Sequence, residues 1–141
     1  CNSTREIADT FVAHLDKSIV IADWEYEVAG ETWRSAKHFR DAGFDVICCS
    51  YSKPANIDAA VRTACEEKLM GYMKTTWHTL ARQVPKLAYG GVVSWQGHGL
   101  SAKQQDILGD NTAHILRRIS PPKGNYATAG WSEEQIRSDL S

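Results

Sequence analysis

The chain has 141 residues, of which 23% are charged, and its formal net charge is −1. This length suits one domain with a substantial core, because a domain of this size hides roughly two thirds of its unfolded surface. The near-neutral charge argues against a nucleic-acid partner, which would call for a basic patch or a high pI. No apolar run approaches the roughly 20 residues of a membrane-spanning helix, and no signal peptide is visible, so no membrane partner is expected.

The four cysteines, Cys1, Cys48, Cys49 and Cys65, form no CxxC pair. Neighbouring residues on a strand point to opposite faces, so Cys48 and Cys49 are expected on opposite sides of a sheet. We interpret the cysteines as small buried hydrophobic residues, which favours a reducing compartment such as the cytoplasm. The histidines do not fall at metal-ligand spacing with one another or with the cysteines, so neither a metal nor a cofactor is expected.

An amphipathic helix is predicted first. Its apolar stripe runs at helical spacing from Ile7 to Leu15, and Ser3 or Thr4 can cap its start. Residues 19–22 (IVIA) follow as a strand. This run is β-branched and continuous rather than alternating, which is typical of a strand buried on both faces of a parallel sheet.

The same order of elements then repeats twice. Residues 30–42 predict a helix, and residues 44–49 (FDVICC) predict a second buried strand. Asn56 can cap a third helix that Gly71 ends, and a third strand covers residues 72–77.

Helices alone are predicted in the remainder of the chain. A fourth helix begins near residue 79, and Pro85 either kinks it or marks a second start. Residues 101–119 indicate a further helix, and a capping-box pattern at Ser132 starts a short last one.

The three predicted strands begin about 26 residues apart and each is followed by a helix, which indicates βα units with parallel strands. We therefore expect an α/β protein in two parts. Residues 1–98 would form an α-(βα)3 portion, and residues 99–141 would form a helical C-terminal extension. Three strands are few for a barrel or a doubly wound sheet, so the sheet is expected to belong to a larger one.

Ligands of parallel α/β sheets bind beyond the carboxyl ends of the strands, and each predicted strand ends in an aromatic residue beside a polar one. The candidate residues are Trp24, Glu25 and Tyr26 after the first strand, Tyr51 after the second, and Trp77 and His78 after the third. Indole rings can stack on the apolar face of a pyranose, while carboxylates and hydroxyls bind its hydroxyl groups. The alternative is that the tryptophans close the end of the core and that Glu25 faces solvent.

The stretches IVIADWEYE, GFDVICCSYSKPAN and MGYMKTTWHTLARQVPKLAYGGVVSW carry a resemblance over residues 5–98. In their order and spacing they resemble the last three βα units of a glycoside hydrolase barrel, of the family 20 β-N-acetylhexosaminidase type. The resemblance implies a (β/α)8 (TIM) barrel, of which this chain carries strands six to eight. It also implies retaining, substrate-assisted hydrolysis of O-glycosyl bonds without a cofactor.

The resemblance also implies roles for single residues. Trp24 and Trp77 would wall the pocket around an N-acetylhexosamine, and Tyr51 would hydrogen-bond the acetamido carbonyl of the sugar. The catalytic Asp-Glu pair of the family follows its fourth strand, and no Asp-Glu dipeptide occurs in this sequence, so no catalytic residue is assigned here. His78 and Thr79 stand where the family has an acidic sugar ligand.

We therefore expect the C-terminal part of a carbohydrate-binding hydrolase that is inactive alone. Its open sheet edges would pair with the missing N-terminal half of the barrel or with a second copy of the chain. The alternative is a small flavodoxin-like or receiver-like doubly wound domain that acts as a binding or signalling module. Such a domain needs about five strands and a phosphate or phosphoacceptor loop after the first, where this sequence has DWEYE.

Overall fold

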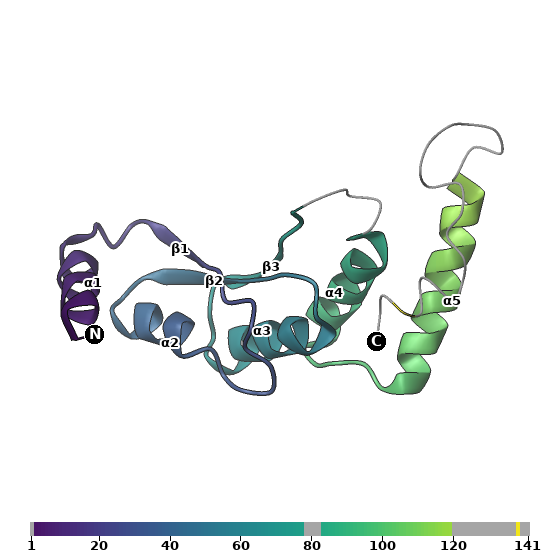
Figure 1. The fold of residues 1–141 in the computed structure, drawn as a ribbon, viewed down its shortest axis with the longest axis horizontal. Coiled ribbons are helices and arrows are strands. Elements are labelled where there is room, and N and C mark those ends of the chain that lie inside the picture. The colour runs from purple at the N-terminus through teal and green to yellow at the C-terminus, as the bar shows by residue number, and fades with distance from the viewer. Residues whose placement is uncertain (1, 78–82, 120–137, 139–141) are drawn as a thin grey trace.

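The computed structural model describes residues 2–77, 83–119 and 138. In this part of the chain the protein is α/β, with one parallel three-stranded sheet and five helices. In chain order the elements are α1 (Asn2–His14), β1 (Val20–Asp23), α2 (Arg34–Asp41), β2 (Asp45–Ser50), α3 (Pro54–Glu66), β3 (Gly71–Lys74), α4 (Val84–Gln96) and α5 (Ala102–Ile119) (Figure 1). The predicted α/β class and the parallel βα order are confirmed. The helix predicted at Ser132 lies outside the described residues.

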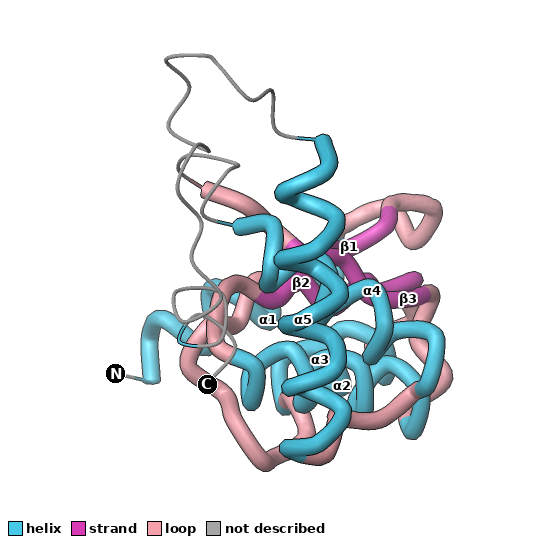
Figure 2. The backbone as a smooth tube through the Cα atoms, turned by 90° about the vertical axis from the view of Figure 1, so that its right-hand side faces the viewer, coloured by secondary structure: helices cyan, strands magenta, loops and turns pink. Residues whose placement is uncertain are grey.

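The sheet has the strand order β1-β2-β3, so strands that follow one another in the chain are also neighbours in space. Val20 lies opposite Asp45 in the first parallel pair, and Ile47 lies opposite Gly71 in the second. The connecting helices α2 and α3 lie on the same side of the sheet in both ribbon views (Figures 1 and 2). The carboxyl ends of all three strands therefore meet at one edge, with the helices to one side of it.

The main core lies between the sheet and helices α2 and α3. Trp33, just before α2, is fully buried and belongs to one apolar cluster with Val46 and Cys48 of β2. Alanines at positions 59 and 60 also belong to this cluster, and their small side chains allow α3 to lie close to the sheet. The backbone N–H of Trp33 donates to Thr63 Oγ1 at 3.1 Å, which ties the start of α2 to α3.

A second apolar cluster joins α3 to α4 and α5. Its residues include Ile57 and Val61 of α3, Tyr89 of α4 and Leu116 of α5. The hydroxyl of Tyr89 donates to the carboxylate of Asp58 at 2.8 Å, so the buried phenol has a partner. The division of the chain into residues 1–98 and 99–141 stays a prediction.

The other face of the sheet is not covered by the described helices. Val20 and Met73 are 44% and 41% exposed on that face, and Ala22 is exposed beside them. The prediction that the first strand is buried on both faces is therefore wrong for the described part of the chain. The physical reason is that α2 and α3 both cross on one side, so no described helix lies over the apolar side chains of the opposite side (Figure 1).

Three predicted boundaries need correction. The third helix begins at Pro54 with Lys53 as its N-cap, so Asn56 lies inside the first turn and is not the cap. Gly71 does not end that helix, because α3 already ends at Glu66. The chain then turns at Lys68, whose φ is 51°, and Gly71 is the first residue of β3. The third strand ends at Lys74 instead of residue 77.

Other predictions on the helices and cysteines have mixed outcomes. Pro85 stands in the first turn of α4 and so marks a helix start, where its missing N–H costs no hydrogen bond. The stripe of α1 is only half covered, since Phe11 is 65% exposed while Val12 is buried. Cys48 and Cys49 are buried as predicted, but Cys65 is exposed.

Candidate functional site

Four of the predicted site residues come together at the carboxyl edge of the sheet, and we call them the aromatic cluster: Trp24, Tyr26, Tyr51 and Trp77. The rings of Trp24 and Trp77 lie 5.3 Å apart at 79°, an edge-to-face contact. The rings of Tyr26 and Tyr51 lie 5.4 Å apart at 40°. The indole N–H of Trp77 donates to the Tyr26 hydroxyl at 2.6 Å, which joins the two pairs. Side chains from all three strand ends therefore form one continuous group.

A chain of hydrogen bonds fixes this cluster to the sheet. The Thr75 hydroxyl donates to the carbonyl of Ser50 at 2.7 Å, and the Thr75 backbone N–H donates to the same oxygen at 2.9 Å. Because the Thr75 hydrogen is used there, Thr75 accepts from the Tyr26 hydroxyl at 3.1 Å. Tyr26 in turn accepts from Trp77. Tyr26 therefore has no hydrogen left to donate, and its role in the cluster is to hold Trp77 in place.

Asn56 of α3 fixes two of the loops that carry the cluster. Its side chain is fully buried, and its amide nitrogen donates to the carbonyls of Glu25 and Val28, both at 2.8 Å. Its amide oxygen accepts the backbone N–H of Tyr51 at 3.2 Å. One side chain thus satisfies three backbone groups of the loops after β1 and β2 and sets their spacing.

The remaining predicted residues are not part of the cluster. Glu25 is half-buried, and within residues 2–77, 83–119 and 138 its carboxylate has no hydrogen bond or ion pair. Glu25 contributes to the loop through its backbone carbonyl, which Asn56 binds. His78 lies outside the described residues.

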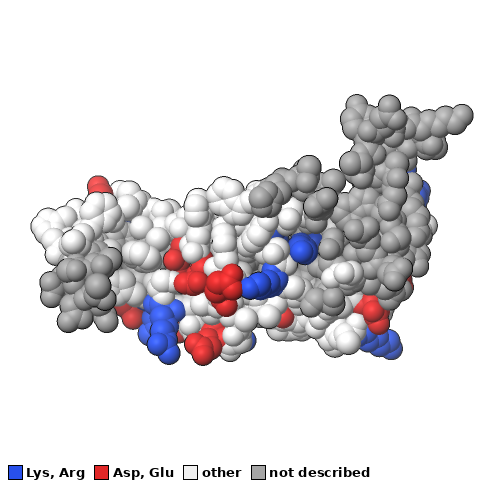
Figure 3. All heavy atoms as spheres, in the orientation of Figure 1, with Lys and Arg blue, Asp and Glu red and all other residues white. Residues whose placement is uncertain are grey.

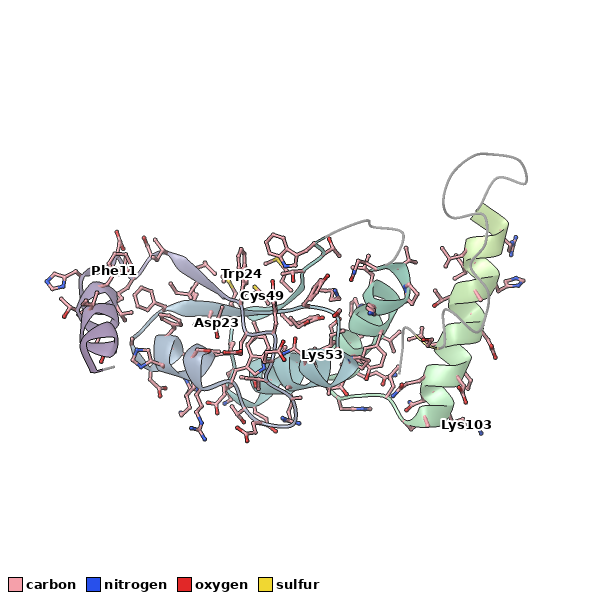
Figure 4. All side chains as sticks on the ribbon, viewed as in Figure 1. Phe11, Asp23, Trp24, Cys49, Lys53 and Lys103 are labelled. Carbon is pink, nitrogen blue, oxygen red and sulfur yellow. The ribbon has the colours of Figure 1, made fainter. Side chains whose placement is uncertain are left out.

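Asp23, which ends β1, is a buried carboxylate on the helix side of the sheet. It accepts a hydrogen bond of 2.7 Å from the Ser35 hydroxyl at the start of α2. Burial raises the pKa of Asp23 above its ordinary value, and the negative charge of Glu25 acts in the same direction. Figure 4 shows Asp23 below the strands and Trp24 above them, so consecutive residues face the two sides. Asp23 ties β1 to α2 and does not reach the aromatic cluster.

Cys49 lies beneath Trp24 on the side of the sheet that the helices leave open (Figure 4). Burial raises the pKa of its thiol, and a hydrogen bond with Trp24 partly offsets this effect. Cys48, on the helix side, has its pKa raised to about 12 by burial. Both thiols therefore stay protonated near neutral pH, and a thiolate nucleophile is not available from either.

Lys74, which ends β3, is a cation beside the cluster that sequence reasoning did not select. Its ammonium group donates to the carbonyl of Thr75 at 2.6 Å and lies 5.3 Å from the centre of the Tyr51 ring. Burial, with a smaller contribution from the positive charge of Lys86, lowers the pKa of Lys74 to about 8. The sequence pattern placed Lys74 inside a longer strand. The polar run Lys-Thr-Thr is unusual for a strand interior and could have indicated that the strand ends at Lys74.

Figure 3 shows most of the acidic and basic residues in view below the strands. Asp45, which lies opposite Val20 at the start of β2, is an exposed carboxylate on the open face. The nearest ion pair joins Lys53 to Glu27 at 2.7 Å, with both side chains exposed at the outer end of the loops. The open side of the cluster therefore presents mainly aromatic rings and hydroxyls, with Lys74 at its border.

The fold and this cluster define an α/β protein whose candidate binding site lies at the carboxyl ends of parallel strands. No model of a known protein family matches the chain, and a search of curated proteins finds no match. No helix in the described part is long and apolar enough to cross a membrane. The relationship to glycoside hydrolases therefore stays a prediction.

Proposed function

We propose that this chain is the C-terminal part of a (β/α)8-barrel glycoside hydrolase of the β-N-acetylhexosaminidase type, and that the aromatic cluster walls its sugar pocket. The observation that supports this most is the meeting of aromatic side chains from all three strand ends, at the edge where barrel enzymes bind their substrates. A cluster that served only to close a core would bury its indoles. Trp24 and Trp77 are 56% and 44% exposed.

The form of the sheet supports a barrel wall. Strand order follows chain order, and the connecting helices lie on one side, as they do around the outside of a barrel (Figure 1). The opposite face carries apolar side chains such as Val20 and Met73, which would fill the barrel interior. In a flavodoxin-like or receiver-like domain the strand order reverses and helices cover both faces, so these features favour the barrel over the alternative.

The geometry also suits an N-acetylated sugar. Trp24 and Trp77 stand nearly perpendicular, so together they form a corner in which the apolar face of a pyranose can rest on one indole. The hydroxyl of Tyr51 has no partner in the described part of the chain, whereas that of Tyr26 is already used. Tyr51 is therefore the tyrosine of the cluster that can donate to an acetamido carbonyl.

The residues described here bind and orient a sugar, and none is assigned a proton transfer. Hydrolysis would need the general acid and its carboxylate partner from another part of the protein. We expect the 141-residue chain to bind N-acetylhexosamines without hydrolysing aryl N-acetylhexosaminides.

The proposal is tested by titrating the 141-residue chain with N-acetylglucosamine and recording the indole N–H signals by NMR. We expect the Trp77 signal to shift, and we expect Trp24→Ala to abolish binding. The matched control is Trp95→Ala, because Trp95 is a 92% exposed tryptophan on α4 outside the cluster. Equal affinity in the Trp24→Ala and Trp95→Ala variants, or no binding by the parent chain, would overturn the proposal.

Tyr51→Phe tests the assignment of the acetamido group. Loss of one hydrogen bond of about 1 kcal/mol should weaken N-acetylglucosamine binding about 5-fold and leave the affinity for glucose unchanged. A Tyr51→Phe variant that binds both sugars as the parent chain does removes Tyr51 from the site.

A further inference from the structure

Lys74 is a half-buried lysine at a position where the stability of the fold does not call for a charged side chain. Its stem lies beside α4 at Gly90, where an added Cβ would lie 3.7 Å from Cβ and Cγ of Lys74, an ordinary packing distance. The stem thus runs between β3 and α4, and the ammonium group emerges at the carboxyl edge beside the Tyr51 ring. Fold stability alone would favour an apolar side chain in such a half-buried place.

Among the described residues, no negative charge compensates the charge of Lys74. Its ammonium group donates there to a neutral acceptor, the carbonyl of Thr75. The positive charge of Lys86, in the first turn of α4, lies within electrostatic reach and opposes it further. In the part of the chain that the structure describes, no carboxylate forms an ion pair with either lysine.

Other lysines of the molecule show the contrast. Lys53 pairs with Glu27, and Lys37 pairs with Asp41 and Glu67. Each of these lysines is about half exposed or more, where water already solvates the charge. The half-buried Lys74 therefore has less solvation than these lysines and, in the described residues, no carboxylate either. A half-buried cation that has no carboxylate partner among the described residues is what a binding site for an anionic group requires.

We propose that the sugar bound at the aromatic cluster carries an anionic substituent, and that Lys74 binds this substituent. The inference rests on the proposed function and names the substrate class more narrowly: an acidic sugar, bearing a carboxylate, sulfate or phosphate group. The ammonium of Lys74 stands beside Tyr51, the residue assigned to the acetamido group. A second substituent of the same sugar can therefore reach it. Lys74 needs no acidic residue of its own because the substrate supplies the negative charge.

The experiment titrates the 141-residue chain with N-acetylglucosamine, its 6-sulfate and 6-phosphate, and glucuronate, and with inorganic sulfate and phosphate alone. The variant Lys74→Met keeps the length of the stem and removes the charge. The matched control is Lys53→Met, at the same edge of the sheet but already paired with Glu27. We expect at least one acidic sugar to bind about 10-fold or more tightly than N-acetylglucosamine. This preference should disappear in Lys74→Met and persist in Lys53→Met. The affinities for the three acidic sugars show whether a sulfate, a phosphate or a carboxylate group is recognised.

The other outcomes separate the two proposals. Equal affinity for neutral and acidic sugars overturns the inference about Lys74 and leaves the sugar site standing. An unchanged preference in Lys74→Met, with folding verified by urea denaturation, also overturns the role of Lys74. Inorganic sulfate or phosphate that binds as tightly as any sugar, and loses affinity in Lys74→Met, supports an anion site and contradicts the sugar pocket. Absence of all binding overturns both.

Discussion

The two faces of the sheet have similar side chains and different surroundings. On the helix side Val46 is 1% exposed and packs with Trp33, whereas on the open side Val20 is 44% exposed. Both are valines on neighbouring strands of one parallel sheet. Apolar character therefore does not by itself produce burial, which depends on an element that crosses over that face. The helix side holds the fold together, and no described helix covers the open side.

The tryptophans show the same contrast in larger form. Trp33 is completely buried under the sheet, while Trp24 and Trp77 stand partly exposed at its carboxyl edge. Exposure of an apolar indole ring to water is unfavourable, and tryptophan is enriched at binding surfaces. A partly exposed tryptophan therefore suits a position where a ligand covers its ring. The difference predicts that substitutions on the helix side affect stability first and that substitutions at the edge affect binding first.

Trp33→Ala is expected to have the largest effect. Removing a fully buried indole leaves a cavity, and such changes cost about 3–5 kcal/mol of the free energy of unfolding. The measurement is urea denaturation followed by circular dichroism, with Trp24→Ala as the matched control. The control should lose less than about 1 kcal/mol. Equal losses in the two variants would show that the contrast between the faces has no energetic basis.

Asn56→Ala should have the next largest effect, about 2–4 kcal/mol. It leaves the carbonyls of Glu25 and Val28 and the N–H of Tyr51 without their partner, and each unsatisfied buried group costs about 1–3 kcal/mol. The loss falls short of the full sum because loops near the surface can admit water. The edge-to-face contact of Trp24 with Trp77 should also loosen, which NMR of the indole signals would detect.

The control for Asn56 is Asn111→Ala on the exposed side of α5, where a change within about 0.5 kcal/mol is expected. If Asn56→Ala behaved like this control, the loops would be held by something other than the Asn56 side chain.

The overall class of the fold and the position of the aromatic cluster could be predicted from the sequence. Runs such as FDVICC are continuous and β-branched, and helices follow them at regular spacing, so parallel βα units are the consistent interpretation. Parallel strands bring their carboxyl ends to one edge. The aromatic residues that follow each strand had to lie close together for this reason, and Trp24, Tyr26, Tyr51 and Trp77 do.

The roles of Asn56 and Lys74 could not be predicted in this way. Asn56 after a proline fits a helix cap, and local pattern gives no sign of its bond to Glu25, 31 residues away in the chain. Lys74 was hidden by an error of three residues in the end of the third strand. Both residues act through contacts between distant segments, and periodicity within one segment contains no information about these.

Lys74→Met is expected to stabilise the protein near pH 7, by about 1–3 kcal/mol, because it removes a half-buried charge. The pKa of Lys74 falls from its ordinary value of 10.5 to about 8 in the folded protein. Between these values the unfolded chain holds a proton that the folded protein has lost, so the stability of the parent chain rises with pH across this window. The advantage of Lys74→Met should therefore shrink from pH 8 upward and vanish above pH 10.5.

Urea denaturation at pH 7, 9 and 10.5 measures this change, with Lys103→Met on the exposed side of α5 as the control. A stability difference between the parent chain and Lys74→Met that does not depend on pH would mean that the Lys74 charge is well solvated. Lys74 would then carry no uncompensated charge, and the argument for an acidic substrate would lose its basis.

Val20→Thr on the open face should have the smallest effect, within about 0.5 kcal/mol in dilute protein, because the new hydroxyl meets water. The matched change Val46→Thr places the hydroxyl in the core and should cost about 1–3 kcal/mol. Repeating the urea measurements at increasing protein concentration sharpens the test. If a second copy of the chain covers the open face, the cost of Val20→Thr will grow with concentration, since a partner stabilises only what it binds. A cost that stays constant and small identifies the open face as unpaired in this chain, as expected of a barrel wall that packs against the rest of its own barrel.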